Sequence, residues 1–231
     1  TFLYEGNVIE MVTELEAFTL LVTALAHDLD HMGLNNSFHM KTDSPLGILS
    51  SSSGNKSVLE VHHCNLAIEI LEDPSANVFS GVSEASEQSH AFRTMIDCIL
   101  ATDMAGHMDL MTQFTEMTES GYDKGQRNHR KLVLQMVLKA ADISNVTKPF
   151  EISRLWAISV TEEFYKQGDM EKEKGVDVLP MFDRSKAGEL ANGQIGFINF
   201  VAKKFFLCAV SLLEGMQWTA DQVQANAAEW Q

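Results

Sequence analysis

The residues best suited to chemistry in this 231-residue sequence lie together in the run His27-Asp28-Leu29-Asp30-His31. His27 and His31 are four residues apart and Asp28 lies three before His31, so a helix would bring these side chains to neighbouring positions. Imidazole and carboxylate groups bind divalent cations. Because a carboxylate has two oxygens, Asp28 could bridge two ions, and a two-metal site polarises a phosphate and generates hydroxide at neutral pH. The alternative is a polar helix end whose imidazoles face solvent.

A further carboxylate, Asp142, follows an apolar run over residues 132–138. A carboxylate is costly to bury unless it is paired, hydrogen-bonded or bound to a metal ion. The alternative is a helix end that already lies in water. Glu60, His62 and His63 form another polar group within an apolar helix. They could hold metal-bound water and orient ligands, or be ordinary satisfied polar groups.

Apolar residues at helical spacing predict that helices position these groups. The predicted helices cover residues 8–25, 57–71, 92–100, 131–141, 156–164 and 194–213. The first ends just before His27, and the fourth ends at Asp142. Ser57 can cap the second helix through a capping box with Glu60.

Three segments between these helices are predicted to be irregular. Residues 35–57 and 77–89 are polar and are expected to form loops. Residues 168–193 are charged, contain an apolar island at 178–182, and are expected to form a long surface segment that could gate a pocket.

Composition limits the class of protein. With 45% hydrophobic and 21% charged residues the chain is globular, which excludes collagen-like, coiled-coil and disordered classes. The 4 prolines and 14 glycines are too few for the turns that many short strands would need, so an all-α fold is predicted. No internal repeat or linker divides the sequence, and we expect a single domain over residues 1–231.

Charge and cysteine content limit the partners and the compartment. The net charge of −15 argues against a surface for nucleic acid or anionic lipid, so no nucleic-acid partner is expected. No apolar stretch of membrane-spanning length lacks charge, and no membrane partner is expected. The three cysteines form no CxxC pair or even framework, which indicates a reducing compartment. The sequence therefore predicts a soluble cytoplasmic protein.

Five motifs occur in one order along the chain. They are ALAHDLDHMG (24–33), SVLEVHH (57–63), ATDM (101–104), KAADISNVTKP (139–149) and GQIGFI (193–198). On these motifs the chain resembles the catalytic domain of class I cyclic-nucleotide phosphodiesterases. The stretches TEEFYKQGDMEKEKG and VLPMFDRSK look most like the kinetoplastid B-type members. The resemblance spans essentially the whole chain and implies an all-α, compact multi-helix bundle of the HD-superfamily type.

The resemblance also implies the chemistry. It implies hydrolysis of the 3′,5′-cyclic phosphate of cyclic AMP, with cyclic GMP as the other candidate substrate, to a 5′-monophosphate. The implied cofactors are Zn²⁺ and Mg²⁺, with Mn²⁺ as a substitute for Mg²⁺. His27, Asp28 and Asp142 would be zinc ligands, and Asp28 would also reach the magnesium. The residues implied around the magnesium waters and the bridging hydroxide are His31, Glu60, His63 and Thr102.

A base pocket is implied in the same way. Gln194 would recognise the purine edge, Phe197 and Val160 would pinch the base, and Asn145 would add a hydrogen bond to adenine. An amide supplies both donor and acceptor, and apolar side chains cover a purine face. Further candidates at the pocket are Phe164, Met104 and Met181. Without the motifs, the stripe formed by Trp156, Val160 and Phe164 is typical of ordinary core.

One element of the family pattern is missing. The family has an upstream HNxxH element that supplies a zinc-binding histidine and the general acid, and residues 1–26 contain no histidine. The sequence is therefore expected to be a piece that starts just after that element, with weak metal binding and low turnover by itself. Two alternatives remain: an inactive nucleotide-binding regulatory module, and another HD-type nucleotide phosphohydrolase. A homodimer is a candidate assembly.

Overall fold

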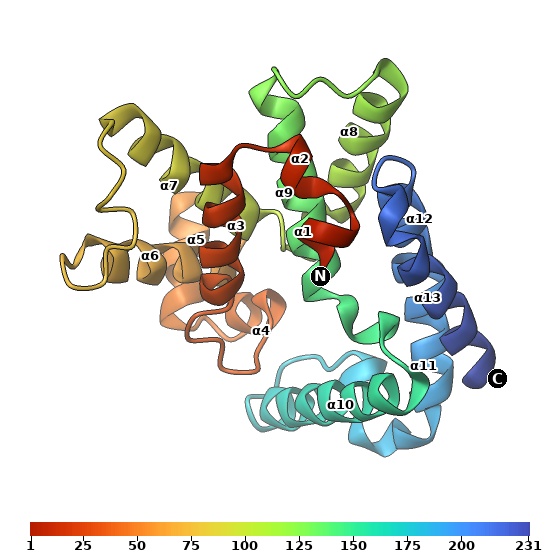
Figure 1. Ribbon diagram of the computed structural model, residues 1–231. Coiled ribbons are helices and arrows are strands. Elements are labelled where there is room, and N and C mark those ends of the chain that lie inside the picture. Colours follow the sequence, from red (N-terminus) through yellow and green to blue (C-terminus); the bar gives the residue numbers. More distant parts are fainter. The chain divides into compact units, whose positions relative to one another are not determined.

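The computed structural model describes residues 1–186 and 188–231, is 75% helical, and contains no strand in those residues (Figure 1). The all-α prediction is confirmed. The helices form two compact units, each assembled from segments distant in sequence. Unit 1 comprises residues 1–31, 59–142 and 211–215, and unit 2 comprises residues 32–58, 143–210 and 216–231. The prediction of a single domain stays a prediction.

Unit 1 is built around one central helix, α9 (Arg127–Asp142), which contacts α1, α3, α7 and α8 (Figure 1). Its buried residues include Val133, Met136 and Ala140, which are fully enclosed. The elements of unit 1 that precede α9 are α1 (Phe2–Glu5), α2 (Val8–Met11), α3 (Glu14–Ala26), α6 (Val58–Glu72), α7 (Ala85–Leu100), η1 (Met104–Gly106) and α8 (His107–Ser120). The bounds of α6 agree with the predicted helix to within one residue, whereas α9 begins four residues before its predicted start at Lys131 and α8 was not predicted.

The predicted helix over residues 8–25 is wrong in one respect, because Thr13 divides it. Thr13 is extended, its hydroxyl accepts a hydrogen bond from the Glu16 amide, and the Glu16 carboxylate accepts one from the Thr13 amide at 2.9 Å. This capping box starts a new helix at Glu14. The buried Glu16 also pairs with Arg130 of α9 and His90 of α7, each at 2.8 Å. Glu16 thereby joins three helices.

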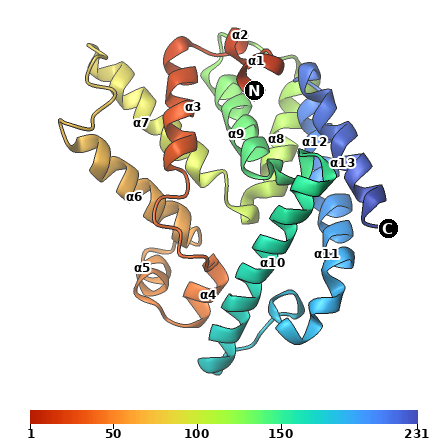
Figure 2. The same ribbon diagram turned by 60° about the horizontal axis from the view of Figure 1, so that its bottom comes forward.

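Unit 2 is organised along its longest helix, α10 (Phe150–Glu173), which contacts η2, η3, η4, α11 and α13. Figure 2 shows α10 beside α11. The other elements of unit 2 are α4 (Asn36–Lys41), α5 (Pro45–Ser53), η2 (Ser144–Thr147), η3 (Pro180–Phe182), η4 (Arg184–Glu189), α11 (Leu190–Phe197), the π-helical turn η5 (Ile198–Ala202), α12 (Lys203–Val210) and α13 (Gln217–Glu229). The short η6 (Glu214–Met216) crosses the boundary between the units, and α13 was not predicted.

The predicted loop over residues 35–57 is wrong, because most of it forms α4 and α5. Asn35 accepts a hydrogen bond from the Phe38 amide at 2.8 Å and begins α4. Ser44 accepts one from the Gly47 amide, and Pro45 occupies the first helical position of α5. Asparagine, serine and proline favour loops, but the same residues also favour helix starts.

The predicted surface segment over residues 168–193 is also partly wrong, because α10 continues to Glu173. Gly168 lies within this helix and allows close approach. A Cβ there would be 1.9 Å from the backbone oxygen of Phe182. The predicted loop over residues 77–89 is also partly wrong, because α7 already begins at Ala85.

The predicted last helix over residues 194–213 is found as the continuous run Leu190–Val210, which begins four residues and ends three residues earlier than predicted and has a π-helical turn at Ile198–Ala202. By length and composition alone this run could cross a membrane, although core helices of soluble proteins meet the same criteria. The expectation of no membrane partner stays a prediction.

Candidate metal centre

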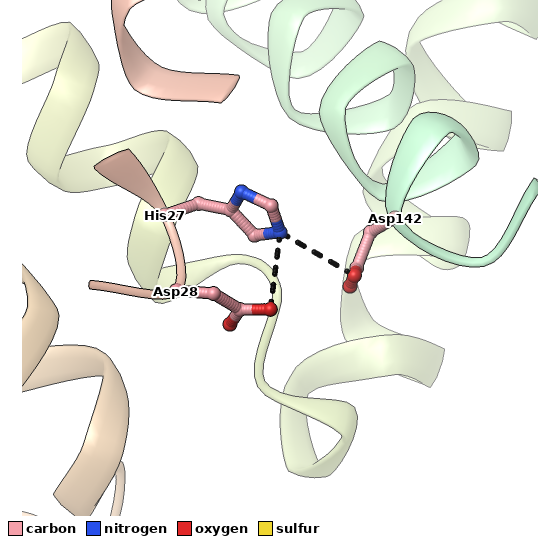
Figure 3. Close-up of side chains that lie close together, drawn as sticks. All are labelled: His27, Asp28 and Asp142. Atoms are coloured by element: carbon pink, nitrogen blue, oxygen red, sulfur yellow. Dashed lines mark ion pairs between the residues drawn. The ribbon is translucent and has the colours of Figure 1, made fainter. Parts of the chain in front are cut away.

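Three side chains of unit 1 converge on one point. His27 caps the end of α3, Asp28 follows it, and Asp142 is the last residue of α9. His27 Nε2 lies 3.4 Å from Asp28 Oδ2 and 3.5 Å from Asp142 Oδ1 (Figure 3). One ligand atom from each residue lies within 4.8 Å of the other two. The helix ends predicted to carry chemistry therefore meet.

The His27 ring is oriented so that one nitrogen is committed and the other faces the carboxylates. Nδ1 lies 2.9 Å from the backbone oxygen of Ala24, so Nδ1 carries a hydrogen and donates it. Nε2 then faces Asp28 and Asp142. A hydrogen bond with Asp142 raises the pKa of His27 to about 9, and burial opposes this shift. Two carboxylates and an imidazole nitrogen that converge in this way favour a bound cation, which is either a proton or a metal ion.

The residues fit a divalent metal ion. One imidazole nitrogen and two carboxylate oxygens are ligands that zinc accepts, and the second oxygen of Asp28 is available for a neighbouring ion. The side chains of His27, Asp28 and Asp142 are 20%, 57% and 30% exposed, so water and substrate can reach the cluster. The hydrogen bond from His27 Nδ1 to a backbone carbonyl is the usual orienting contact of a metal-binding histidine.

His63 of α6 lies beside this cluster and is suited to hold water. Its side chain is 2% exposed, and Nδ1 donates to the backbone oxygen of Leu29 at 2.6 Å. Burial lowers the pKa of His63, which favours the neutral ring with a lone pair on Nε2. That nitrogen lies 3.8 Å from Asp28 Oδ1. Two facing acceptors at this spacing suit a water molecule that donates a hydrogen bond to each.

The other residues expected near the metal waters belong to the same unit. The exposed His31 ring lies 5.9 Å from the His63 ring, and Glu60 lies three residues before His63 on α6. The Thr102 hydroxyl donates to the backbone oxygen of Ile99 at 2.7 Å. Its one hydrogen is thereby committed, so this hydroxyl can only accept a hydrogen bond from a nearby water.

Sequence reasoning missed one contact that fixes the turn after α3. His62 Nε2 lies 2.9 Å from Asp30 Oδ2, and Asp30 has a φ of +61°. This contact ties the turn that carries Asp28 and His31 to α6. Asp30 and His62 are both visible in the sequence, but only the fold shows that their side chains pair.

The residues expected to bind the nucleotide base lie mostly in unit 2. Val160 and Phe164 lie on α10 and Gln194 and Phe197 on α11, and these two helices contact each other. All four residues are half-buried. The remaining candidates are Asn145 in η2 and Met181 in η3, both in unit 2, and Met104 in η1 of unit 1.

The surroundings of three of these candidates can be described further. The Phe164 ring packs edge-on against the buried ring of Phe182, with centroids 5.0 Å apart, as a core residue would. Met104 and Met181 are 46% and 56% exposed. The roles of all seven base-pocket candidates stay predictions.

Fold and cluster together define an all-helical protein with a His/Asp cluster that could hold a metal ion. The sequence profile of the 3′,5′-cyclic nucleotide phosphodiesterase family matches residues 1–223, and the chain belongs to that family. Members of this family are metal-dependent. The predicted family and the metal-dependent class are therefore confirmed.

Individual relatives agree with this assignment. The chain is 35% identical to the dual 3′,5′-cyclic-AMP and -GMP phosphodiesterase 11A of Takifugu rubripes, over 96% of this chain and 24% of that protein. It is 36% identical to the high-affinity cGMP-specific phosphodiesterase 9A of Mus musculus, over 91% of this chain and 38% of that protein. Among solved structures it is similar to LmjPDEB1, the Leishmania PDEB1, in complex with IBMX, with 64% identity and a TM-score of 0.97 over 100% of this chain and 69% of that one. The chain thus spans well under half of these curated relatives.

Proposed function

We propose that the protein containing this chain hydrolyses the 3′,5′-cyclic phosphate of cyclic AMP to 5′-AMP and so ends cyclic-nucleotide signalling. The observation that carries the proposal is the convergence of His27, Asp28 and Asp142 within 4.8 Å, in a member of the cyclic-nucleotide phosphodiesterase family. Metal-assisted attack on a phosphodiester needs such a cluster at a solvent-accessible position.

We assign His27, Asp28 and Asp142 as ligands of Zn²⁺, with Asp28 shared with Mg²⁺ or Mn²⁺. Bound metal ions supply Lewis-acid polarisation of the phosphate and a hydroxide nucleophile at neutral pH. The protein contributes the orientation of these ligands. His27 is held by the Ala24 carbonyl, and the turn that carries Asp28 is held by the contact of Asp30 with His62.

The neighbouring side chains are proposed to hold the attacking water. His63, neutral and donating through Nδ1, presents the lone pair of Nε2, and Thr102 presents an acceptor hydroxyl. Both therefore accept hydrogen bonds from water, which directs the water lone pair away from them. We assign Glu60 and His31 to the same water network, on the basis of the family motifs.

We propose that Gln194 recognises the purine edge, while Phe197 and Val160 cover its faces and Asn145 adds a contact to adenine. The contact between α10 and α11 supports this assignment, because it brings Val160 and Gln194 onto adjoining helices. An amide can present donor or acceptor in either order. The relatives include a dual-specificity and a cGMP-specific enzyme, and we assign cyclic AMP on the resemblance to the kinetoplastid B-type members.

A substrate panel tests the proposal. Purified full-length protein is incubated with cyclic AMP, cyclic GMP and linear nucleotides, first with metal and then with a chelator. We expect metal-dependent release of 5′-AMP from cyclic AMP. Hydrolysis of linear nucleotides alone would indicate a different phosphohydrolase, and tight binding of cyclic AMP without turnover would indicate an inactive regulatory module.

We also propose a cytoplasmic location and a homodimer. Cys64, Cys98 and Cys208 are free thiols, as expected in a reducing compartment. Fractionation of cells that express the tagged full-length protein tests the location, and light scattering tests the assembly.

A further inference from the structure

A lysine lies fully enclosed in unit 1. The Lys139 side chain on α9 has no exposed surface, and its ammonium donates three hydrogen bonds. The acceptors are the backbone oxygens of Ala101, Thr102 and Asp103, at 3.0, 3.0 and 3.1 Å. An ammonium group has three hydrogens, so its donors are fully used.

These acceptors explain why a charge is tolerated there. The acceptors directly follow the end of α7 at Leu100, where the carbonyls lack the amide partners of the helix interior, although the Asp103 carbonyl also accepts from the Gly106 amide at 3.2 Å. They also carry the negative end of the helix dipole, which favours a cation. One turn earlier on α9, Gln135 Nε2 donates to the backbone oxygen of Asp97 at 2.9 Å. The helix α9 thus carries two long side chains that donate hydrogen bonds to the last turn of α7 and to the residues that follow it.

The charged groups around Lys139 come from several elements. Asp142, Asp103 and Glu60 favour its charged form, whereas burial lowers its pKa to about 8. His107 lies near the ammonium as well. Burial, together with the positive charge of Lys139, lowers the pKa of His107. At pH 7 the lysine therefore remains about nine-tenths protonated and keeps all three donors.

The turn that Lys139 holds contains Thr102. The Thr102 hydroxyl bonds back to Ile99, and the Thr102 carbonyl bonds to Lys139, so the residue is fixed on both sides. Lys139 in turn lies three residues before Asp142 on the same helix. One side chain therefore connects the turn with Thr102 to the helix end with Asp142.

We propose that Lys139 is a positioning residue of the metal centre, which acts by fixing the Ala101–Asp103 turn so that the Thr102 hydroxyl accepts from metal-bound water. The inference rests on the proposed phosphodiesterase function, because the role of Thr102 was assigned there. It goes beyond that function in giving a task to a buried side chain that touches neither metal nor substrate.

Four variants of the metal-loaded full-length protein test the proposal: Lys139→Met, Gln135→Met, Thr102→Val and the double variant Lys139→Met/Thr102→Val. Gln135→Met is the matched control, because it removes a donor between the same two helices one turn away. We expect Lys139→Met to lower kcat about tenfold, equivalent to one lost hydrogen bond, with KM for cyclic AMP unchanged. We expect Gln135→Met to leave kcat unchanged.

The double variant shows whether Lys139 acts through Thr102. Residues that act on one contact are not additive, so the double variant should lose no more kcat than the more damaged single variant. Multiplied losses in the double variant would overturn the proposal. So would an equal loss of kcat in Gln135→Met, since that result would show general loosening of the helix pair.

Amide hydrogen exchange provides a readout that does not depend on turnover. Residues 102–106 should exchange faster in Lys139→Met than in wild type or Gln135→Met, and unchanged exchange would overturn the proposal. If Lys139→Met does not fold, Lys139→Gln replaces it, because its shorter, uncharged amide retains two of the three donor hydrogens. A wild type without turnover would refute the phosphodiesterase function, and the exchange comparison would still decide whether Lys139 holds the turn.

Discussion

The proton on His27 makes a measurable prediction about metal binding. In the metal-free protein, Asp142 and Asp28 raise the pKa of His27 to about 9. A metal ion needs the Nε2 lone pair that this proton occupies. We therefore predict that zinc binding to the metal-free full-length protein displaces about one proton at pH 7.5.

The magnitude follows from the pKa. A histidine with a pKa of about 9 is about 97% protonated at pH 7.5, whereas one with the ordinary pKa of about 6.5 is about 9% protonated. At pH 7.5, about 1.5 units below the pKa of His27, removing this proton costs about 2 kcal/mol. Zinc affinity should therefore be about 30-fold weaker at pH 7.5 than well above pH 9. Because its pKa is raised on folding, His27 stabilises the metal-free fold fully below pH 6.5, and this contribution is lost as pH rises through about 9.

Titration calorimetry in buffers of different ionisation enthalpy measures the protons released. Between pH 6.5 and 7.5 we expect the count to remain near one, whereas an ordinary histidine would give a count that falls from about one-half to about 0.1. The control is His27→Gln, which lacks the ionisable ring but retains any ionisation of metal-bound water. A wild-type count equal to that of His27→Gln would refute this account of the cluster.

Three further predictions concern stability and nucleotide binding. Glu16→Gln should lower the free energy of unfolding by about 3 kcal/mol, because it breaks a buried ion pair with Arg130. Urea denaturation at pH 7 measures this loss of stability, and the loss should disappear as the pH falls below the lowered pKa of Glu16. In thermal unfolding, Gly168→Ala should destabilise the fold, because the added Cβ would meet the Phe182 backbone. Gly196→Ala lies at an open helical position and should stabilise the fold by about 0.5 kcal/mol. Stabilisation by both variants would contradict the close contact at position 168. Gln194→Ala should weaken binding of cyclic AMP about tenfold in calorimetry with metal content unchanged, and loss of metal instead would refute the base-pocket assignment.

The cluster of His27, Asp28 and Asp142 could be predicted because its signals are local. His27 and Asp28 are adjacent, and Asp142 is a charge that closes an apolar helix. Each signal is readable within a few residues, and the helices needed to carry them follow from apolar spacing. The structure adds what spacing cannot give, namely that the ends of α3 and α9 meet.

Buried polar contacts could not be predicted, because their partners are distant in sequence. Lys139 bonds to carbonyls 36 to 38 residues away, and Glu16 pairs with Arg130 across 114 residues. A charge inside an apolar run shows that some partner exists but not which one. The helices α4 and α5 were missed for another reason. Their asparagine and serine residues favour both loops and helix caps, and only the packed structure distinguishes the two.

The most direct test of the central claim is release of 5′-AMP from cyclic AMP, with magnesium present, by full-length wild type and Asp142→Asn. The substitution keeps the shape of the side chain but removes the charge that a metal ion needs. Asp109→Asn, at an exposed position of α8, is the matched control. We predict metal-dependent turnover in wild type and the control, and a loss of at least about 100-fold, together with bound metal, in Asp142→Asn. Equal turnover in Asp142→Asn, or none in wild type, would contradict the account.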